Sequence, residues 1–257
     1  MIINASAHNI PLADKSVHSV VTSPPYFGLR RYEGAQDVDW PAGVYSPMTG
    51  CPPCVEVPAM RCPLGNESTI EAFIWHLLLV MRELKRVLRD DGTCWVNLGD
   101  SYSGSGKGGN PENSPFQKQA TNFGSLIAPT KLESEIAGGN LLAIPHRFAL
   151  AAQADGWTLR NDCVWHKKSA MPESVAGWRF QDGQLRRGSW RHTRAHEYVF
   201  QFVKGMGYWS DSAIVKEAAI YKGDERHLRT DTRKTVDVMC VDNGSRARTG
   251  NPTTGRN

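Results

Sequence analysis

The feature that most constrains the fold is a long amphipathic segment between two apolar, β-branched runs. Residues 69–88 carry apolar side chains at helical spacing, and Ser68 or Thr69 can cap the first turn. Residues 17–22 (VHSVVT) and 93–98 (TCWVNL) are predicted to be buried strands before and after it. A strand, a crossover helix and a second strand predict a parallel pair, and therefore an α/β fold.

Further regular elements alternate with long polar stretches along the rest of the chain. We expect the first helix to end at Asp90-Asp91-Gly92, and a second helix to span residues 141–154. Strands are expected over residues 158–166 and 197–203, the last one as a hairpin-like or late antiparallel element. Long insertion loops, a class that is usually functional or disordered, are expected at residues 27–66, 101–140 and 169–194.

Composition narrows the class of protein. The 257 residues are 40% hydrophobic and 22% charged, which suits one globular domain with insertions or with a small second lobe. The net charge is only +4, but arginines gather late in the chain, so we expect a local basic surface for a polyanion. A solvated loop face is the alternative.

Localisation is predicted from what the chain lacks. Residues 1–10 do not resemble a signal peptide, and no apolar run approaches the roughly 20 residues that cross a bilayer. We therefore expect no membrane partner. Cys94 and Cys163 lie in apolar strand-like runs, where we expect ordinary buried thiols and hence a reducing cytoplasm.

The first strand ends in Ser23-Pro24-Pro25-Tyr26, at the edge of a parallel sheet where ligands bind. An exocyclic amino group of a base is a poor nucleophile, because its lone pair is delocalised into the ring. Ser23 Oγ and the Pro24 carbonyl could accept both amino protons and free that lone pair, with prolines stiffening the geometry. Tyr26 could stack on the base, a contact worth about 1–3 kcal/mol. A turn hydroxyl is the alternative for Ser23.

This motif and its continuation through Tyr32 resemble the catalytic motif of amino-group DNA methyltransferases. These enzymes methylate N4 of cytosine or N6 of adenine with S-adenosylmethionine. The tetrapeptide alone also occurs in turns and peptide ligands, but the resemblance extends from about residue 1 to about residue 218. Similar segments are Glu83–Leu88, Asp91–Thr93, Trp95–Tyr102, Ile144–Arg147, Asp155–Arg160, Trp165–Lys167 and His196–Tyr198.

The resemblance implies a partial Rossmann-like methyltransferase sheet with helices on its faces and long insertion loops. Residues 1–218 would be the catalytic part, and residues 219–257 a basic tail that leads into the donor-binding part. The resemblance assigns Ser23, Pro24 and Pro25 to the amino-group site and Tyr26 to the face of a base flipped out of double-stranded DNA. It also implies S-adenosylmethionine as donor and a restriction endonuclease as a partner.

One family segment is not found. Members with this motif order carry the donor-binding segment late, as an apolar strand followed by a Phe-x-Gly-x-Gly turn and a carboxylate, so the cofactor-binding residues stay unassigned here. The glycine-rich residues 103–109 follow a different strand and open no helix, which argues against a cradle for the donor. We therefore expect a catalytic half with residues 17–22 as an open apolar sheet edge. We also expect weak or no donor binding by this chain alone.

DNA contacts are expected from the loops at residues 101–140 and 169–194. Aromatic and cationic side chains suit phosphates and unstacked bases. The alternatives are an insertion that packs on its own aromatics and, for the tryptophan after the third strand, a place in the core. The DNA-binding candidates are Trp165, Lys167, Arg179, Arg186, Arg187 and Arg191.

A cysteine cluster has half of a zinc-site pattern. Cys51-Pro-Pro-Cys54 supplies two thiolates on one turn, and Cys62 follows. No fourth ligand is evident, since His76 falls within the predicted helix. We expect no metal and keep these cysteines as candidates, with free loop thiols as the alternative.

The leading hypothesis is N4-cytosine methylation, because a serine heads the motif where an acidic or amide residue is more usual for adenine. The alternatives are N6-adenine methylation and a nonenzymatic DNA-binding fragment without its donor pocket. A fourth possibility is methylation of glutamine or RNA, because Pro-Pro-Tyr motifs also serve such enzymes. The matches at Gly99–Tyr102 and His196–Tyr198 favour DNA.

Overall fold

The computed structural model describes most of the region in which the elements were expected. The predicted tail, residues 219–257, lies outside the described residues. The loop at residues 101–140 is described only at its two ends and at residues 125–126. Full description covers residues 2–28, 36–103, 136–168, 180–186 and 194–211, and the backbone alone is described at 31–32, 125–126, 176–179 and 187–189.

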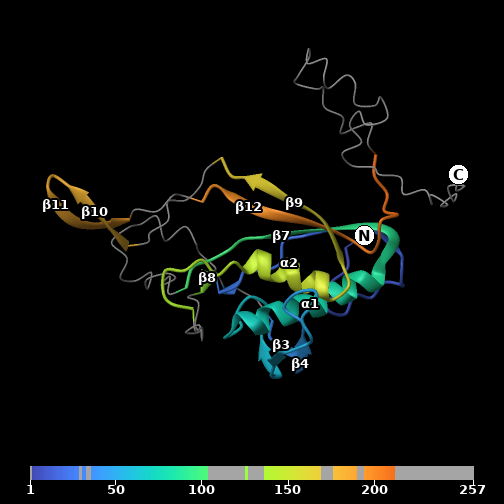
Figure 1. Cartoon of the computed structure of the whole chain (residues 1–257). Helices are drawn as coiled ribbons and strands as arrows, with labels where there is room; N and C mark the ends of the chain where they lie inside the picture. The colour runs from blue at the N-terminus through green and yellow to red at the C-terminus, as the bar shows by residue number, and fades with distance from the viewer. Residues whose placement is uncertain are drawn as a thin grey trace, which may run out of the picture.

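A four-stranded mixed sheet in the order β1-β7-β12-β9 forms the centre of the fold (Figure 1). β1 (Val17–Thr22) pairs in parallel with β7 (Leu88–Leu98), and α1 (Ile70–Val87) connects them, as predicted. β12 (His196–Val203) runs antiparallel between β7 and β9 (Thr158–His166). The α/β class and the late antiparallel strand are therefore confirmed, and in the described part of the chain β1 is an open edge strand.

α1 begins where the sequence indicates and ends earlier. Thr69 is the N-cap, and its Oγ1 accepts a hydrogen bond from the Ala72 N–H at 3.1 Å. The expected stop at Asp90-Asp91-Gly92 is wrong, because the helix ends at Val87 and these residues lie within β7. Parallel pairing with β1 already starts at Leu88, so tertiary pairing prevails over the local turn signal.

Both described helices pack on the same face of the sheet (Figure 1). α2 (Ile144–Ala154) starts three residues later than expected, because Leu142 N–H donates to the Ser101 carbonyl in an extended segment. The shared core alternates along β7 and β12 with a period of two, as expected for a strand with one covered face. Its central side chains are Cys94, Val96, Leu98, Phe200 and Phe202.

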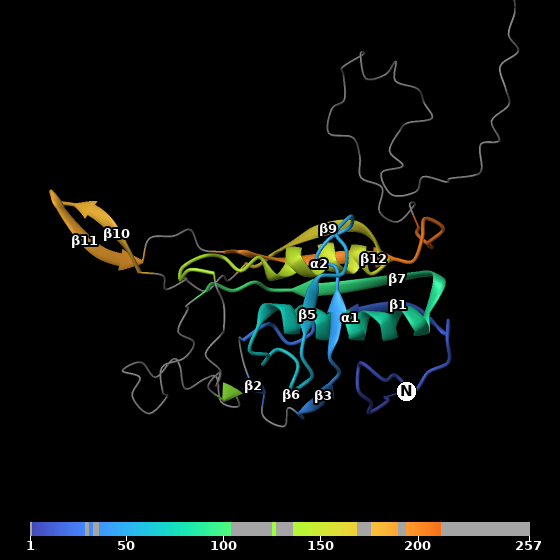
Figure 2. The same ribbon diagram turned by 60° about the horizontal axis from the view of Figure 1, so that its bottom comes forward.

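The stretch at residues 27–66, expected to be irregular, contains two nested antiparallel pairs (Figure 2). Buried Trp40 and Tyr45 anchor them against the outer side of α1, where Trp75 Nε1 donates to the Pro41 carbonyl at 2.9 Å. Strands of three residues are too short to show alternation, which is why the sequence pattern missed them. The pairs are β3 (Val38–Trp40) with β6 (Met60–Cys62), and β4 (Gly43–Tyr45) with β5 (Val55–Val57).

The predicted loop at residues 169–194 also contains regular structure. β10 (Ala176–Gln181) and β11 (Gln184–Ser189) form a separate antiparallel hairpin. Asp182 and Gly183 at its turn both have positive φ, 53° and 74°, as an Asp-Gly hairpin turn requires. A short pair also joins β2 (Arg31–Tyr32) to β8 (Ser125–Leu126).

No helix in the described ranges is long and apolar enough to span a membrane. Cys94 is fully buried, as expected, and burial raises the pKa of its thiol to about 12. Cys163 is only partly buried, because it lies on β9, an edge strand of the sheet as described.

We predict that Thr69→Ala destabilises the chain by about 1 kcal/mol, the usual cost of losing an N-cap side chain. Urea unfolding of the purified chain measures it. Ser68→Ala, one residue earlier, is the matched control and should stay within about 0.5 kcal/mol of the wild type. Equal losses in the two variants would contradict the assignment of the cap.

Candidate active site at the carboxyl edge of the sheet

Four strand ends meet at one edge of the sheet. β1, β7 and β9 end there, and the antiparallel β12 begins there, with Glu197 paired to Trp165 and Tyr198 to Leu98. The Ser-Pro-Pro-Tyr motif follows β1 directly, so it lies at the same edge. The structure thus places the predicted catalytic segment where parallel sheets bind ligands.

A hydrogen-bonded cluster centred on the Glu197 carboxylate connects these ends. Tyr26 Oη donates to Glu197 Oε2 at 2.9 Å, and Asn97 Nδ2 donates to the same oxygen at 2.9 Å. Lys167 Nζ lies 2.9 Å from it as well. Asn97 Nδ2 also donates to Tyr26 Oη at 2.9 Å, which closes the cluster. One carboxylate therefore connects the aromatic residue of the motif to β7, to β12 and to the residue that follows β9.

The environment of Glu197 keeps it ionised. Partial burial by itself would raise the pKa of the carboxyl group, but hydrogen bonds from Asn97, Lys167 and Tyr26 outweigh it and hold the pKa below its ordinary value. A carboxylate with a lowered pKa is a poor general base at neutral pH. Its suitable roles are to position Tyr26 and to supply a fixed negative charge.

Ser23 is the exposed member of the motif. Its Oγ donates a long hydrogen bond of 3.4 Å to Tyr26 Oη, which leaves the lone pairs of Ser23 Oγ available to accept a proton from a bound group. Pro24 and Pro25 are half-buried beside it. The geometry is therefore compatible with the acceptor role expected of Ser23.

Tyr26 is held from two sides. A Cβ added at Gly99 would lie 2.5 Å from the Tyr26 ring, so only glycine allows the ring this close to the end of β7. On the other side, the turn at Gly65 contacts Pro25 and the Tyr26 carbonyl, and Gly65 O accepts a hydrogen bond from Gly28 N–H at 2.7 Å. The motif is thus supported by β7 and by the stretch at residues 27–66.

Asp100 joins β7 to the start of α2. Its side chain is fully buried, and Oδ1 accepts hydrogen bonds from the backbone N–H groups of Ser101 at 2.9 Å and Ile144 at 3.0 Å. Arg194, just before β12, lies 3.6 Å from Oδ2. Asp100 therefore supports the edge of the sheet behind the Glu197 cluster.

The DNA-binding candidates are only partly described. Trp165 is half exposed, so its alternative place in the core is wrong, and Lys167 Nζ lies 3.8 Å from the centre of its ring. Arg186 is exposed on the β10–β11 hairpin. The side chains of Arg179 and Arg187, and all of Arg191, lie outside the described residues. Their DNA contacts stay a prediction.

The three candidate cysteines are not brought together. Cys51 and Cys54 lie between β4 and β5, and Cys54 is exposed, whereas Cys62 ends β6. In the part of the chain that the structure describes, Cys62 instead groups with Glu67 and His76. Burial raises the pKa of the Cys62 thiol to about 12, with a further contribution from Glu67.

Sequence reasoning assigned no role to Asn97, Glu197 or Asp100, although all lie in segments that match the family. A signal was present, since Asn97 and Glu197 are polar residues inside apolar strands. A polar residue inside an apolar strand is informative, and at the carboxyl end of the strand it indicates a ligand-binding edge.

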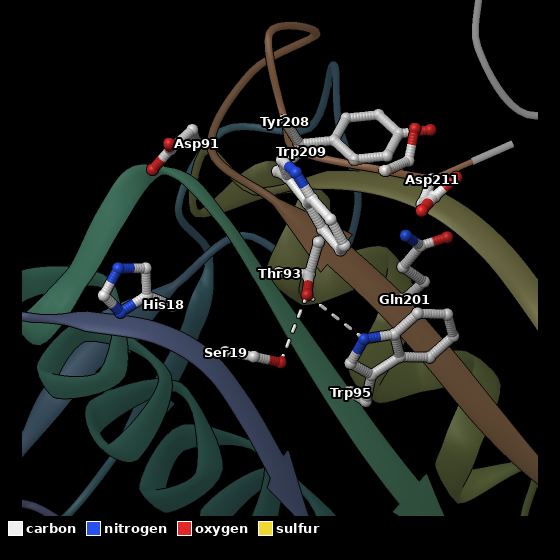
Figure 3. Close-up of a pocket in the computed structure, with 10 residues that line it drawn as sticks. His18, Ser19, Asp91, Thr93, Trp95, Gln201, Tyr208, Trp209 and Asp211 are labelled. Carbon is white, nitrogen blue, oxygen red and sulfur yellow. Dashed lines mark hydrogen bonds between the residues drawn. The ribbon is translucent and has the colours of Figure 1, made fainter. Parts of the chain in front are cut away.

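A cavity of about 680 Å³ lies on the face of the sheet opposite the helices (Figure 3). His18 and Asp91 place it toward the beginning of β1 and β7, away from the Ser23 motif. Trp95 and Trp209 make it largely apolar. Ser19, Thr93 and Trp95 are linked there by hydrogen bonds of 3.2 Å. This position does not suit the amino-group chemistry expected of the motif.

We predict that Glu197→Gln flattens the acid dependence of stability. In the wild type, the ionised Glu197 side chain stabilises the fold at pH values above 4.5, the ordinary pKa of the group. This stabilisation is lost as the pH falls through the lowered pKa of Glu197 in the folded state. The gap in melting temperature between wild type and variant should therefore shrink as the solution is acidified. Circular dichroism across pH values measures it.

Glu56→Gln, at an exposed position on β5, is the control and should follow the wild type at every pH. A constant gap between Glu197→Gln and the wild type from neutral to acid pH would contradict the ionised Glu197 cluster.

Comparison with known proteins places the chain in a family. A profile described as DNA methylase, of the N6 and N4 type, matches residues 17–251. The type II methyltransferase M.Cfr9I of Citrobacter freundii is 35% identical over 206 residues, 80% of this chain and 54% of that protein. M.SmaI of Serratia marcescens is 33% identical over 213 residues, 82% of this chain and 58% of that protein.

The chain thus spans about half the length of these curated relatives. Among solved structures, the cytosine-N4-specific PvuII DNA methyltransferase is similar at 15% identity and a TM-score of 0.42, over 80% of this chain and 48% of that one. The family profile covers nearly the whole chain and includes the Ser23 motif and Glu197. The chain belongs to the N6 and N4 DNA methylase family.

Proposed function

We propose that the protein transfers a methyl group from S-adenosylmethionine to the exocyclic amino group of a flipped base in double-stranded DNA, with N4 of cytosine preferred. The observation that carries this proposal is the exposed Ser23 hydroxyl beside a Tyr26 that is fixed by an ionised carboxylate. Membership of the DNA methylase family supports the reaction class. Residues 1–218 act as the catalytic part.

The reaction needs no protein nucleophile. Ser23 Oγ and the Pro24 carbonyl accept the two amino protons, so that the nitrogen lone pair turns toward the donor. S-adenosylmethionine, when bound, would supply an activated methyl group that passes from sulfur to this nitrogen, and the donor would leave as a neutral thioether. The amino nitrogen, now positively charged, then loses one proton to solvent.

Glu197 acts in this reaction through its charge and not as the base. Positive charge develops on the amino nitrogen as the methyl group is transferred, and a fixed anion behind Tyr26 and Ser23 favours that charge. Lys167 and Asn97 keep the carboxylate in place. Its lowered pKa suits this electrostatic role.

The base would occupy the space beside Tyr26 and Trp165. Flipping costs a few kcal/mol, which stacking on aromatic side chains offsets. Trp165 is half exposed at the same sheet edge, so its aromatic ring is available to a base, while Lys167 lies above that ring and pairs with Glu197. Arg186 on the exposed hairpin is a further phosphate contact in this proposal.

The choice of cytosine rests on the serine that heads the motif. A neutral hydroxyl in this place is more usual for N4-cytosine enzymes, and N6 of adenine is the second candidate. The M.Cfr9I and M.SmaI relatives are named as type II methyltransferases. A restriction endonuclease with the same recognition sequence is therefore the partner that we propose.

We predict that Ser23→Ala lowers methyl transfer by on the order of a hundredfold, the scale for losing one preorganised hydrogen-bonding partner at a developing charge. Transfer of labelled methyl groups from the donor to DNA measures the rate. The 257-residue chain should be assayed at a high donor concentration, because weak donor binding is expected of it.

Ser19→Ala, an exposed serine on the same strand, is the matched control and should retain the wild-type rate. A Ser23→Ala protein with full activity would remove the role assigned to Ser23. An active wild type with no preference for DNA over RNA or protein would refute the substrate class.

A further inference from the structure

A second cluster of reactive side chains lies where the stretch at residues 27–66 meets α1. Cys62 ends β6, Glu67 follows a short turn, and His76 projects from α1. One ligand atom from each, a thiol sulfur, a carboxylate oxygen and an imidazole nitrogen, lies within 4.8 Å of the others. This set lies outside the Glu197 cluster and has no role in the proposed methyl transfer.

His76 is fully buried, and its Nδ1 atom faces the Glu67 carboxylate. Nδ1 lies 2.9 Å from Glu67 Oε1, while Nε2 has no hydrogen-bond partner in the described part of the protein. Trp40 stacks on the imidazole at 4.3 Å and fixes the plane of the ring. The stacked ring keeps Nδ1 beside the Glu67 carboxylate, where both groups can reach one ion.

Glu67 is a buried carboxylate that requires a cationic partner. Its side chain is fully buried, and within the described residues its ion-pair partner is His76. Its Oε2 accepts a hydrogen bond from Gly65 N–H at 2.8 Å. A carboxylate taken this far out of water is normally paired with a cation or bound to a metal.

We propose that Cys62, Glu67 and His76 bind a zinc ion. A thiolate, an imidazole and a carboxylate are the ligand types that zinc takes in proteins, and the sulfur selects against magnesium and calcium. His76 meets the metal through Nδ1, which lies 2.9 Å from Glu67 Oε1, so that both side chains can bind the same ion. Cys62 is only partly buried, so water can complete the coordination.

The role of the ion is structural support for the catalytic motif. Glu67 holds Gly65 N–H, and Gly65 O accepts the hydrogen bond from Gly28 N–H at 2.7 Å, two residues beyond Tyr26. A Cβ at Gly65 would lie 3.0 Å from Pro25 Cβ, so this turn lies directly against the prolines. Zinc would fasten β6, this turn and α1 together behind the Ser-Pro-Pro-Tyr segment.

The test is metal analysis of the 257-residue chain purified without tags or chelators. We expect about one equivalent of zinc per chain by mass spectrometry. After removal of the metal, titration with cobalt should give the absorption of a cobalt–thiolate bond, and zinc should raise the melting temperature of the metal-free chain. Cys62→Ser should lose the cobalt–thiolate absorption, whereas Cys54→Ser, at an exposed cysteine outside the cluster, should keep it.

A folded wild-type chain that contains no metal and shows no cobalt–thiolate absorption overturns the proposal and leaves Glu67 and His76 as a hydrogen-bonded pair. Absorption that survives in Cys62→Ser and disappears in Cys54→Ser overturns it as well, in favour of the Cys51–Cys54 pair. The wild-type measurement decides the question even if Cys62→Ser does not fold.

Discussion

The Glu197 carboxylate is the interaction on which the site depends. Three hydrogen-bond donors from separate segments, Tyr26, Asn97 and Lys167, converge on one oxygen. Each of these donors would be costly to leave unpaired in a half-buried position. Because the carboxylate is ionised, it can accept hydrogen bonds from all three donors at once. It thereby holds the ends of the four strands together at this edge of the sheet. The Ser-Pro-Pro-Tyr motif is therefore positioned by long-range contacts, not by its prolines alone.

The two faces of the sheet differ: one is covered by helices, and the other carries a cavity. α1 and α2 cover one face, and the insertion covers the outer side of α1, so the motif has a rigid support on that side. The opposite face carries the cavity beside Trp95, and β1 is an edge strand with Val21 81% exposed, as far as the described residues show. An apolar edge of this kind favours association with another strand.

Much of this architecture follows from periodicity. The strand at 17–22, the helix after Thr69 and the antiparallel last strand were predictable, because each is long enough for its pattern to dominate. Shorter elements were not predictable. β3 to β6 depend on Trp40 and Tyr45 packing against α1, which is a tertiary effect. The Asp182-Gly183 turn was a usable hairpin signal that the surrounding polar sequence concealed.

The residues of the candidate site also fall into those that the sequence indicated and those that it did not. Ser23 and Tyr26 could be found from the motif, since local sequence specifies a strand that ends in prolines. Asn97 and Glu197 could not be paired, because residues 100 positions apart meet only through the order of the sheet. The Cys62, Glu67 and His76 cluster was missed for a similar reason: helical spacing showed His76 as a helix residue but not which way it faces.

The central claim is that the Ser23 edge of the sheet methylates the amino group of a base in DNA. Nucleoside mass spectrometry of DNA incubated with the protein and S-adenosylmethionine tests it most directly. The account predicts N4-methylcytosine. Methylation at ring carbon 5 of cytosine would contradict it, because that reaction needs a covalent nucleophile and not paired acceptors for an amino group.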